Sequence, residues 1–314
     1  MISQDIYKIL RYYLNEREAI RIRREAGRPG PWTRDPILSK YKFTNISRSN
    51  DWTTRWVKKH WYDPNRDQPL EIQALNCAVF RYFGSAEFAE AIGYQKEWDP
   101  GRIITIARNR LSRGQKVFTG AYIITNGGST SPKQEVVVNS YLTPFRQNVE
   151  SVVTIAQRGS WQHTCEYMQK LPGIGAFMSK EIALDMLLTP VLENAYDKLT
   201  WTPVGPGAIR GLHRLHKREI WQPMTQAKGL EQMQELMGVL AQEPRHAVSV
   251  LEREGLERSP EEPGLIAEFP RIGSEYGVTD IQFSLCELDK YLRVRYKEGR
   301  PRSGYDYRKA RAEP

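Results

Sequence analysis

The string LPGIG at Leu171–Gly175 has the clearest chemistry in the sequence. It lies between two helical patterns and predicts a helix–hairpin–helix element. Gly173 permits a turn that other residues disfavour, and Gly175 permits close approach of a phosphate. The free N–H groups at the start of the second helix would face that phosphate, and Ser179 and Lys180 would add side-chain contacts. The hairpin therefore predicts binding to the DNA backbone without reading of its sequence.

A second glycine-rich string, TPVGPGAIRGL, occupies Thr202–Leu212. A rigid turn at Gly205 and Gly207 would expose backbone N–H groups, and the nearby Arg210 guanidinium can take two phosphate oxygens at once. The alternative is an ordinary tight loop at the start of a helix. The residues of the string alone do not decide between a phosphate-binding turn and an ordinary loop.

Three further segments combine polar groups with an apolar background. If the segment Phe43–Trp56 is helical, its polar residues form one ridge. A charge at Arg81, between two aromatic residues, requires a partner or a ligand. The segment Thr279–Tyr291 repeats polar groups at helical spacing around a cysteine, although a solvated helix would explain part of it. The polar residues of these segments are Asn45, Arg48, Asp51, Arg55, Arg81, Gln282, Cys286, Glu287, Asp289 and Lys290.

The elements that must position these side chains are mostly helices, so we predict an all-α fold with long loops. We expect one domain over residues 1–289, with the helix–hairpin–helix at about 161–188, and a basic tail over 290–314. The only expected strand, Glu135–Val138, is too short to build a sheet, and Glu252–Gly264 reads as an acidic loop. The expected helices are Gln4–Arg24, Gln68–Phe83, Glu87–Gly93, Asp99–Arg113, Ser140–Arg158, Trp161–Lys170, Phe177–Leu188, Gly229–Glu243 and Val278–Tyr291.

The net charge of +9 is concentrated at the end of the chain. From Lys290 to Pro314 there are nine basic and three acidic residues, an excess of six. A basic segment with tyrosines suits a polyanion, because cations meet phosphates and rings stack on bases; the alternative is a solubilising terminus. The tyrosines are Tyr291, Tyr296, Tyr305 and Tyr307.

The composition excludes several classes of protein. A hydrophobic content of 40% excludes wholesale disorder. Three cysteines without a CxxC pair exclude a disulfide framework and a structural zinc site. No apolar run reaches the roughly 18 residues that a membrane span needs. We expect a soluble protein without a membrane partner.

The hairpin also resembles that of the helical DNA glycosylase superfamily. In that superfamily an aspartate follows the hairpin at a fairly constant distance, and the resemblance places Asp197 in this role. The Schiff-base lysine of its strand-cleaving members is replaced by Phe177, and no cysteine cluster follows to hold an iron–sulfur centre. The resemblance therefore implies a glycosylase-like helical fold without lyase chemistry.

Taken together, the strings FTNISR…D, FRYFG, KVFTGAY, LPGIG, D…TPVGPGAIRGL and IQFSLCELDKY resemble the phage α-glutamyl/putrescinyl thymine pyrophosphorylases, also called amino acid:DNA transferases. This family is related to the helical domain attached to phage 5-hydroxymethyluracil DNA kinases. The resemblance implies transfer of an amine, an amino acid such as glycine or a polyamine such as putrescine, onto 5-pyrophosphoryloxymethyluracil in double-stranded DNA. It also implies a functional link to that kinase and a location in the cytoplasm of the infected bacterial host.

This reaction defines roles for the residues. Cations must stabilise the departing pyrophosphate, helped by the N–H groups of Gly205 and Gly207. A general base must keep the amine neutral; Asp197 is the first choice, with Asp51 and Glu287 as further candidates. Asn45 and Gln282 match the paired donor and acceptor of the uracil edge. The candidate cations are Arg48, Arg55, Arg81, Lys116, Arg210 and Lys290.

Two routes remain open, direct displacement and a covalent route in which Cys286 adds to C6 of the ring and helps to expel pyrophosphate. No cofactor is required, and a divalent metal is compatible with the reaction although no ligand spacing demands one. The chain has no GxxxxGK[ST] loop and is not itself the kinase. The competing hypotheses are a DNA glycosylase acting on a modified pyrimidine and a non-catalytic DNA-binding module of a modification complex.

Overall fold

The computed structural model describes residues 1–242, 272, 275–301 and 303–309. The predicted all-α fold is confirmed, since the described residues contain no strand apart from two isolated bridges, Tyr41–Gly304 and Ile272–Tyr276. We predicted one domain over residues 1–289; the contacts group instead into two compact units. Unit 1 comprises Met1–Asp51 and Val204–Glu313, and unit 2 comprises Trp52–Pro203. The predicted loop Glu252–Gly264 lies outside the described residues.

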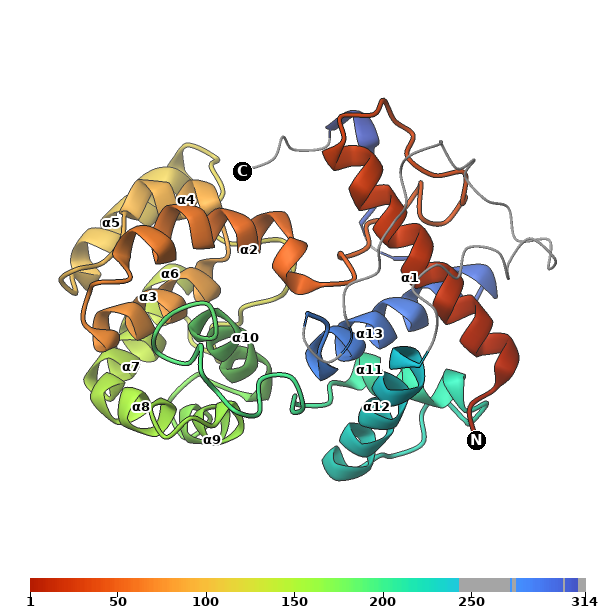
Figure 1. Cartoon of the computed structure of the whole chain (residues 1–314). Helices are drawn as coiled ribbons and strands as arrows, with labels where there is room; N and C mark the ends of the chain where they lie inside the picture. Colours follow the sequence, from red (N-terminus) through yellow and green to blue (C-terminus); the bar gives the residue numbers. More distant parts are fainter. Residues whose placement is uncertain (243–271, 273–274, 302, 310–314) are drawn as a thin grey trace. The chain divides into compact units, whose positions relative to one another are not determined.

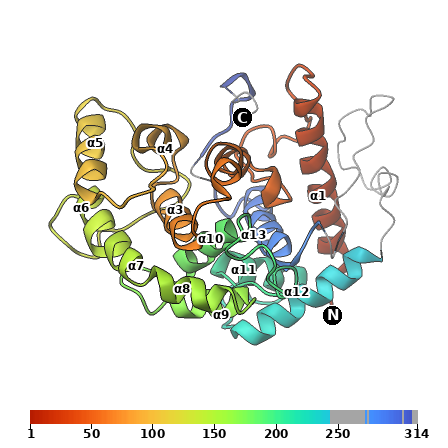
Figure 2. The ribbon, with the colours of Figure 1, turned by 60° about the vertical axis from the view of Figure 1, so that its left-hand side comes forward.

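Unit 1 is built around two helices that pack closely, α11 and α13, which lie side by side in Figures 1 and 2. The packing is close because Gly211 lies directly against the backbone of Leu285. Helix α1 adds the apolar side chains of Ile6, Leu10 and Tyr13 to the same core, as its predicted periodicity requires. The elements of this unit are α1 (Gln4–Glu25), η1 (Arg48–Asn50), α11 (Pro206–Leu215), α12 (Gln226–Ala241), α13 (Val278–Arg295) and η6 (Tyr307–Lys309).

We expect Gly211→Ala to destabilise unit 1 strongly. A Cβ at this position would lie 2.3 Å from the carbonyl oxygen of Leu285, and backbone cannot swing away as a side chain can. Helices α11 and α13 would have to separate, which costs about 3 kcal/mol of unfolding free energy. Urea denaturation measures this cost.

The matched control is Gly238→Ala in α12, where a Cβ meets nothing within 4 Å. There the substitution removes only backbone entropy of the unfolded chain and should stabilise by about 0.5 kcal/mol. Equal effects of the two variants would contradict the close packing of α11 on α13.

The predicted basic tail does not begin at residue 290, because α13 continues to Arg295. The ring of Tyr291 is buried and its hydroxyl donates to Asp35, 2.7 Å away, so it does not stack on bases. Asp35 also accepts from the Tyr12 hydroxyl, at 3.0 Å. Beyond the helix, the backbone of Tyr305 donates to the carbonyl of Lys40. The described part of the tail therefore packs on its own unit.

Unit 2 places α3 at the centre of its core, in contact with α8 and α10, while α7, α8 and α9 follow one another along its edge (Figures 1 and 2). Ser85, Asp99 and Ser160 cap the N-termini of α4, α5 and α9 with their side chains. The helices of this unit are α2 (Trp52–Val57), η2 (Lys58–Tyr62), η3 (Asp63–Asn65), α3 (Leu70–Phe83), α4 (Ala86–Ile92), α5 (Pro100–Ser112), α6 (Lys133–Glu135), η4 (Val136–Leu142), α7 (Thr143–Gln147), α8 (Val149–Ala156), α9 (Trp161–Met168) and α10 (Ala176–Met186).

The predicted strand Glu135–Val138 is wrong, because these residues are helical and belong to α6 and η4. Val136, Val137 and Val138 are all buried, so their branched side chains serve helix packing rather than a sheet. Tertiary burial overrides the β-propensity of valine here.

Two helices, α9 and α10, flank the predicted hairpin. Gly173 has φ +74, the left-handed conformation that we predicted for the hairpin, and the ring of Tyr141 fills the space where a Cβ would lie. The Tyr82 hydroxyl donates to the carbonyl of Gly173 at 3.0 Å. Gly175 precedes α10 with open space around it. The glycosylase-like fold as a whole stays a prediction.

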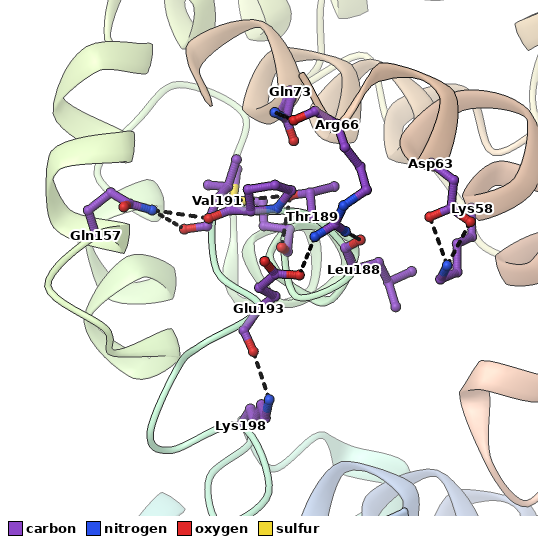
Figure 3. A network of polar contacts seen from close by, with 12 residues as sticks. Lys58, Asp63, Arg66, Gln73, Gln157, Leu188, Thr189, Val191, Glu193 and Lys198 are labelled. Atoms are coloured by element: carbon purple, nitrogen blue, oxygen red, sulfur yellow. Dashed lines mark hydrogen bonds and ion pairs between the residues drawn. The ribbon is translucent and has the colours of Figure 1, made fainter. Parts of the chain in front are cut away.

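The chain after α10 is held by side chains from other parts of unit 2 (Figure 3). Gln157 donates to the carbonyl of Val191 at 2.8 Å, and Arg66 forms an ion pair with Glu193 at 2.7 Å. The Lys198 amine donates to the carbonyl of Glu193. These contacts fix the path of the chain up to Asp197.

Candidate functional site

Four partly exposed side chains form one face of α13 in unit 1. They are spaced three, one and three residues apart and therefore point to the same side of the helix. The four residues are Phe283, Cys286, Glu287 and Lys290. Their neighbours on the other sides of α13 are mostly buried. We call these four residues the α13 face.

Residues 43–51 cover one side of the α13 face. The backbone N–H of Arg48 donates to Asp280 at 3.0 Å, and the Arg48 guanidinium lies over the Phe283 ring, 4.9 Å from its centroid. The backbone N–H of Thr44 donates to Glu287 at 3.4 Å. This segment is irregular except for the short turn at Arg48–Asn50. The condition for the predicted polar ridge, a helix over residues 43–56, is therefore met only from Trp52 onward, in α2. Its N–H groups bind side chains of α13 instead.

The start of α11 covers the other side. A Cβ at Gly205 would lie 3.2 Å from the Gln282 amide nitrogen, and one at Gly207 would lie 2.8 Å from the Cys286 sulfur. The two glycines therefore allow α11 to begin directly against the α13 face. Of the two predicted alternatives for this string, the structure confirms the start of a helix. The phosphate-binding turn stays a prediction.

Arg210 extends the same side of the site along α11. Its Nε donates to Asp289 at 2.9 Å, and its guanidinium lies 5.9 Å from the centroid of the Trp221 ring. Asp289 also accepts from Arg214 at 2.8 Å. Asp289 is buried, so it holds both arginines of α11 against α13.

Glu287 is the carboxylate of the α13 face. Its Oε2 lies 2.5 Å from the Lys290 amine, which in turn lies over the Phe43 ring at 4.6 Å. Burial raises the pKa of Glu287 above its usual value, and Lys290 opposes this effect. A partly exposed carboxyl with a raised pKa is well suited to accept a proton.

Asn45 and Asp51 organise the loop beside the face. The Asn45 amide oxygen accepts from Arg17 at 2.5 Å, its amide nitrogen donates to the carbonyl of Asn50 at 2.6 Å, and its backbone N–H donates to Asp51 at 3.1 Å. The sequence analysis missed Arg17, because a cation on the polar side of α1 carries no signal of a partner 28 residues away.

Asp280 links the loop to the first turn of α13. Its carboxylate accepts from Arg48 and from the backbone of Gly277, both at 3.0 Å. Burial raises the pKa of Asp280 from 3.8 to about 6, against the lowering effect of these two hydrogen bonds. Between those pH values the folded protein holds a proton that the unfolded chain has lost. Its unfolding free energy therefore falls as the pH rises through this window.

We expect Asp280→Asn to remove this pH dependence. We compare the free energies of unfolding of the wild-type protein and the variant at each pH. The advantage of the wild-type protein should be about 2 kcal/mol larger at pH 4 than at pH 7. Denaturation at the two pH values measures this difference. The contributions of the other carboxyl groups cancel, because both proteins share them. A constant difference would show that Asp280 ionises normally in the folded state.

The structure thus brings together the predicted residues of three distant segments. Unit 1 holds Asn45, Arg48, Asp51, Gly205, Gly207, Arg210, Gln282, Cys286, Glu287 and Lys290, whereas unit 2 holds Arg55, Arg81, Lys116, Asp197, Gly173, Gly175, Ser179 and Lys180.

In unit 2, Arg81 is buried and forms a two-pronged ion pair with Asp185, with Nε donating to Oδ2 at 2.6 Å. Glu181 lies 3.9 Å away on the other side. The predicted need for a partner is thus met within the protein, and we do not retain Arg81 as a ligand of pyrophosphate. Lys116 is exposed in the loop after α5, and Arg55 belongs to α2.

Asp197 caps α9. Its Oδ1 accepts from the backbone of Trp161 at 2.7 Å, and its Oδ2 accepts from Gln162 and from the Ser160 hydroxyl, both at 2.9 Å. Both carboxylate oxygens therefore stabilise the start of this helix. A general-base role for Asp197 would compete with these bonds.

The predicted side-chain contacts of Ser179 and Lys180 with DNA are corrected. The Ser179 hydroxyl is fully buried and donates to the carbonyl of Ala176 at 3.1 Å. Lys180 is buried and pairs with Glu181 at 3.4 Å. Both lie on the core side of α10, so these two side chains do not supply the contact of the hairpin with a phosphate.

Among the residues that the structure describes, no three His, Cys, Asp or Glu side chains gather as a group that would hold a metal ion. Within the same residues, no helix combines the length and the apolar character that crossing a membrane requires.

Comparison with known proteins gives two matches. The family described as "5-hmdU DNA kinase, helical domain" matches residues 4–300. A 5-hmdU DNA kinase of Bacillus phage SP10 is 29% identical over 229 residues, which cover 64% of this chain and 35% of that protein. The chain thus spans about a third of the length of this curated relative. No solved structure is significantly similar.

Proposed function

The chain belongs to the family of 5-hmdU DNA kinase helical domains, and on this premise we propose that it is an enzyme of thymine hypermodification in phage DNA. The proposed substrates are double-stranded DNA that carries 5-pyrophosphoryloxymethyluracil and an amine, either an amino acid or a polyamine. The amine nitrogen forms a bond to the 5-methylene carbon, and the bond between this carbon and the pyrophosphate oxygen breaks. Pyrophosphate leaves, and a base takes the proton of the amine.

The observation that supports this proposal best is the composition of the site around the α13 face. Arg48 and Arg210 come from separate segments and reach Phe283 and Asp289 of α13, while Lys290 of the same helix pairs with the carboxyl of Glu287. A pyrophosphate needs several cations as its charge develops, and the amine needs a base.

Each residue has a proposed role. The cations, with the N–H groups of Gly205 and Gly207, stabilise the leaving pyrophosphate. Glu287 is the general base, because its pKa is raised and the oxygens of Asp197 already stabilise α9. Asp51 holds the loop through the backbone of Asn45.

The target base must leave the duplex to reach such a site, so the proposal includes base flipping. Gln282, beside Gly205, is proposed to read the uracil edge, and Asn45 to assist it. The backbone of the hairpin, with Gly173 and Gly175, is proposed to hold a phosphate of the DNA. No cofactor is required in this scheme, and a divalent metal would enter bound to the pyrophosphate.

One specific observation favours a second candidate. The family to which the chain belongs describes the helical domain of a kinase, and the curated relative is about three times longer than the matched part. A module that only binds DNA for a separate modifying enzyme would have the same resemblance. A functional link to a 5-hydroxymethyluracil DNA kinase is part of both proposals.

The test is mass spectrometry of nucleosides after incubation of the protein with 5-pyrophosphoryloxymethyluracil DNA and a panel of amines. We expect an amine adduct together with released pyrophosphate. DNA binding without either product supports the binding module, and abasic sites in hydroxymethyluracil DNA support a glycosylase. Cys286→Ser separates the routes: near-full turnover favours direct displacement, and its loss favours addition of the thiolate to the ring.

A further inference from the structure

The loop of residues 113–133 and the hairpin of residues 169–180 are joined into one surface of unit 2, here called the loop–hairpin surface. The rings of Tyr122 and Phe177 meet edge to face, with centroids 5.2 Å apart. Tyr141 bridges the same two segments. Its ring fills the space beside Gly173, and its hydroxyl donates to the carbonyl of Thr125 at 3.4 Å.

The base of the loop is fixed to the end of α3. The backbone N–H of Thr119 donates to the carbonyl of Phe83 at 2.6 Å, and the Tyr122 hydroxyl donates to the carbonyl of Arg81. Gly84 makes this approach feasible, because a Cβ there would lie 2.7 Å from Thr119. The loop is thus held in place before any ligand binds, which lowers the entropy cost of binding.

Two large apolar side chains project from this surface. Ile123 is 76% exposed and Phe177 is 47% exposed, while the adjacent Ile124 is buried and holds the loop to the core. Ile123 directly follows Tyr122, whose ring packs on Phe177, so the exposed aliphatic side chain is carried by a loop that is already fixed.

The charge of the loop–hairpin surface identifies the partner. The two segments contain no acidic residue, and their basic residues are Arg113, Lys116, Lys133, Lys170 and Lys180. Of these, Arg113, Lys116 and Lys170 are exposed. Two segments that carry exposed basic side chains, an apolar projection and no acidic residue match a duplex, in which phosphates flank stacked bases, better than an average protein surface.

We propose that Ile123, on the loop that the Tyr122–Phe177 contact joins to the hairpin, is a wedge that inserts between stacked base pairs of double-stranded DNA. The exposed cations would meet the phosphates. Burial of the Ile123 side chain between the bases would offset part of the cost of unstacking. The wedge would thereby make base flipping easier. This inference rests on the proposed function for the choice of DNA as ligand.

The experiment uses the full chain and unmodified duplex DNA with 2-aminopurine at successive positions, because 2-aminopurine brightens when it unstacks. With wild-type protein we expect fluorescence to rise at one position. Ile123→Ala should abolish the rise and weaken binding about five- to tenfold. It should leave the slope of affinity against salt unchanged, since no phosphate contact is lost. Ile123→Phe should restore both signals.

Val239→Ala is the matched control, because Val239 is also an exposed branched side chain but lies on α12 of unit 1. It should behave as wild type. An unchanged fluorescence rise in Ile123→Ala overturns the wedge, as does wild-type DNA binding without any rise, the result expected if this surface binds a protein. The assay contains neither pyrophosphate nor amine, so the wedge and the transfer reaction fail independently of each other.

Discussion

Glu287→Gln should lower kcat for amine transfer by about 10²–10⁴-fold, the usual contribution of a general base. Gln has the shape of Glu and keeps an oxygen for the Thr44 N–H, but it does not accept the proton of the amine. Substrate binding should change little. Single-turnover kinetics with quantified pyrophosphate release measure this effect.

Lys290→Met tests the same assignment through pH. The Lys290 amine lies 2.5 Å from the Glu287 carboxylate and lowers its pKa, in opposition to burial. Without this cation the pKa of Glu287 rises further. The acid limb of the kcat/KM profile should therefore move to higher pH, whereas loss of a leaving-group cation alone would lower the rate equally at all pH values. If the acid limb does not move, the general base is another residue.

Local sequence signals located the helices well. The periodicity of α1 and the capping residues before α5 and α9 operate within one or two turns, so these helices overlap their predicted ranges closely. The relation to 5-hydroxymethyluracil kinase helical domains is likewise confirmed. Membership of the transferase family stays a prediction.

The elements that were wrong or missed depend on distant contacts. Residues 43–51 have helical spacing, yet their backbone N–H groups bind Asp280 and Glu287, more than 230 residues later. Nothing near the loop in the sequence marks these partners. Helix α11 is not among the predicted helices, although one of the two alternatives for its string placed the start of a helix there. Its glycines weaken helical propensity, yet they allow it to contact α13.

The same limit applies to the site. Residue types predicted which side chains could do chemistry, but not which of them are buried. Arg81 and Arg210 look alike in sequence, each beside apolar neighbours. Both pair with a distant aspartate, Arg81 with Asp185 and Arg210 with Asp289. They differ in burial, since the Arg81 side chain is 5% exposed and that of Arg210 is 27% exposed, and sequence spacing does not reveal this difference.

The Arg81–Asp185 pair also gives the largest expected effect on stability. Asp185→Ala leaves a guanidinium that is 4% exposed without its main carboxylate and removes the acceptor of the Tyr62 hydroxyl. An unpaired buried charge costs about 3–5 kcal/mol of unfolding free energy. Glu181, 3.9 Å from Arg81, offsets only part of it. Urea denaturation measures the loss.

Two controls separate charge from packing. Lys58→Ala breaks the exposed pair with Asp63 in the same unit (Figure 3) and should cost less than about 1 kcal/mol. The double variant Arg81→Met/Asp185→Leu removes both buried charges and should recover most of the stability that Asp185→Ala loses, because no ion is left unpaired. If the double variant is as unstable as Asp185→Ala, the cost comes from packing and from the lost Tyr62 hydrogen bond. Recovery instead assigns the cost to the unpaired charge of Arg81, and shows that apolar side chains can join α3 to α10 in place of the ion pair.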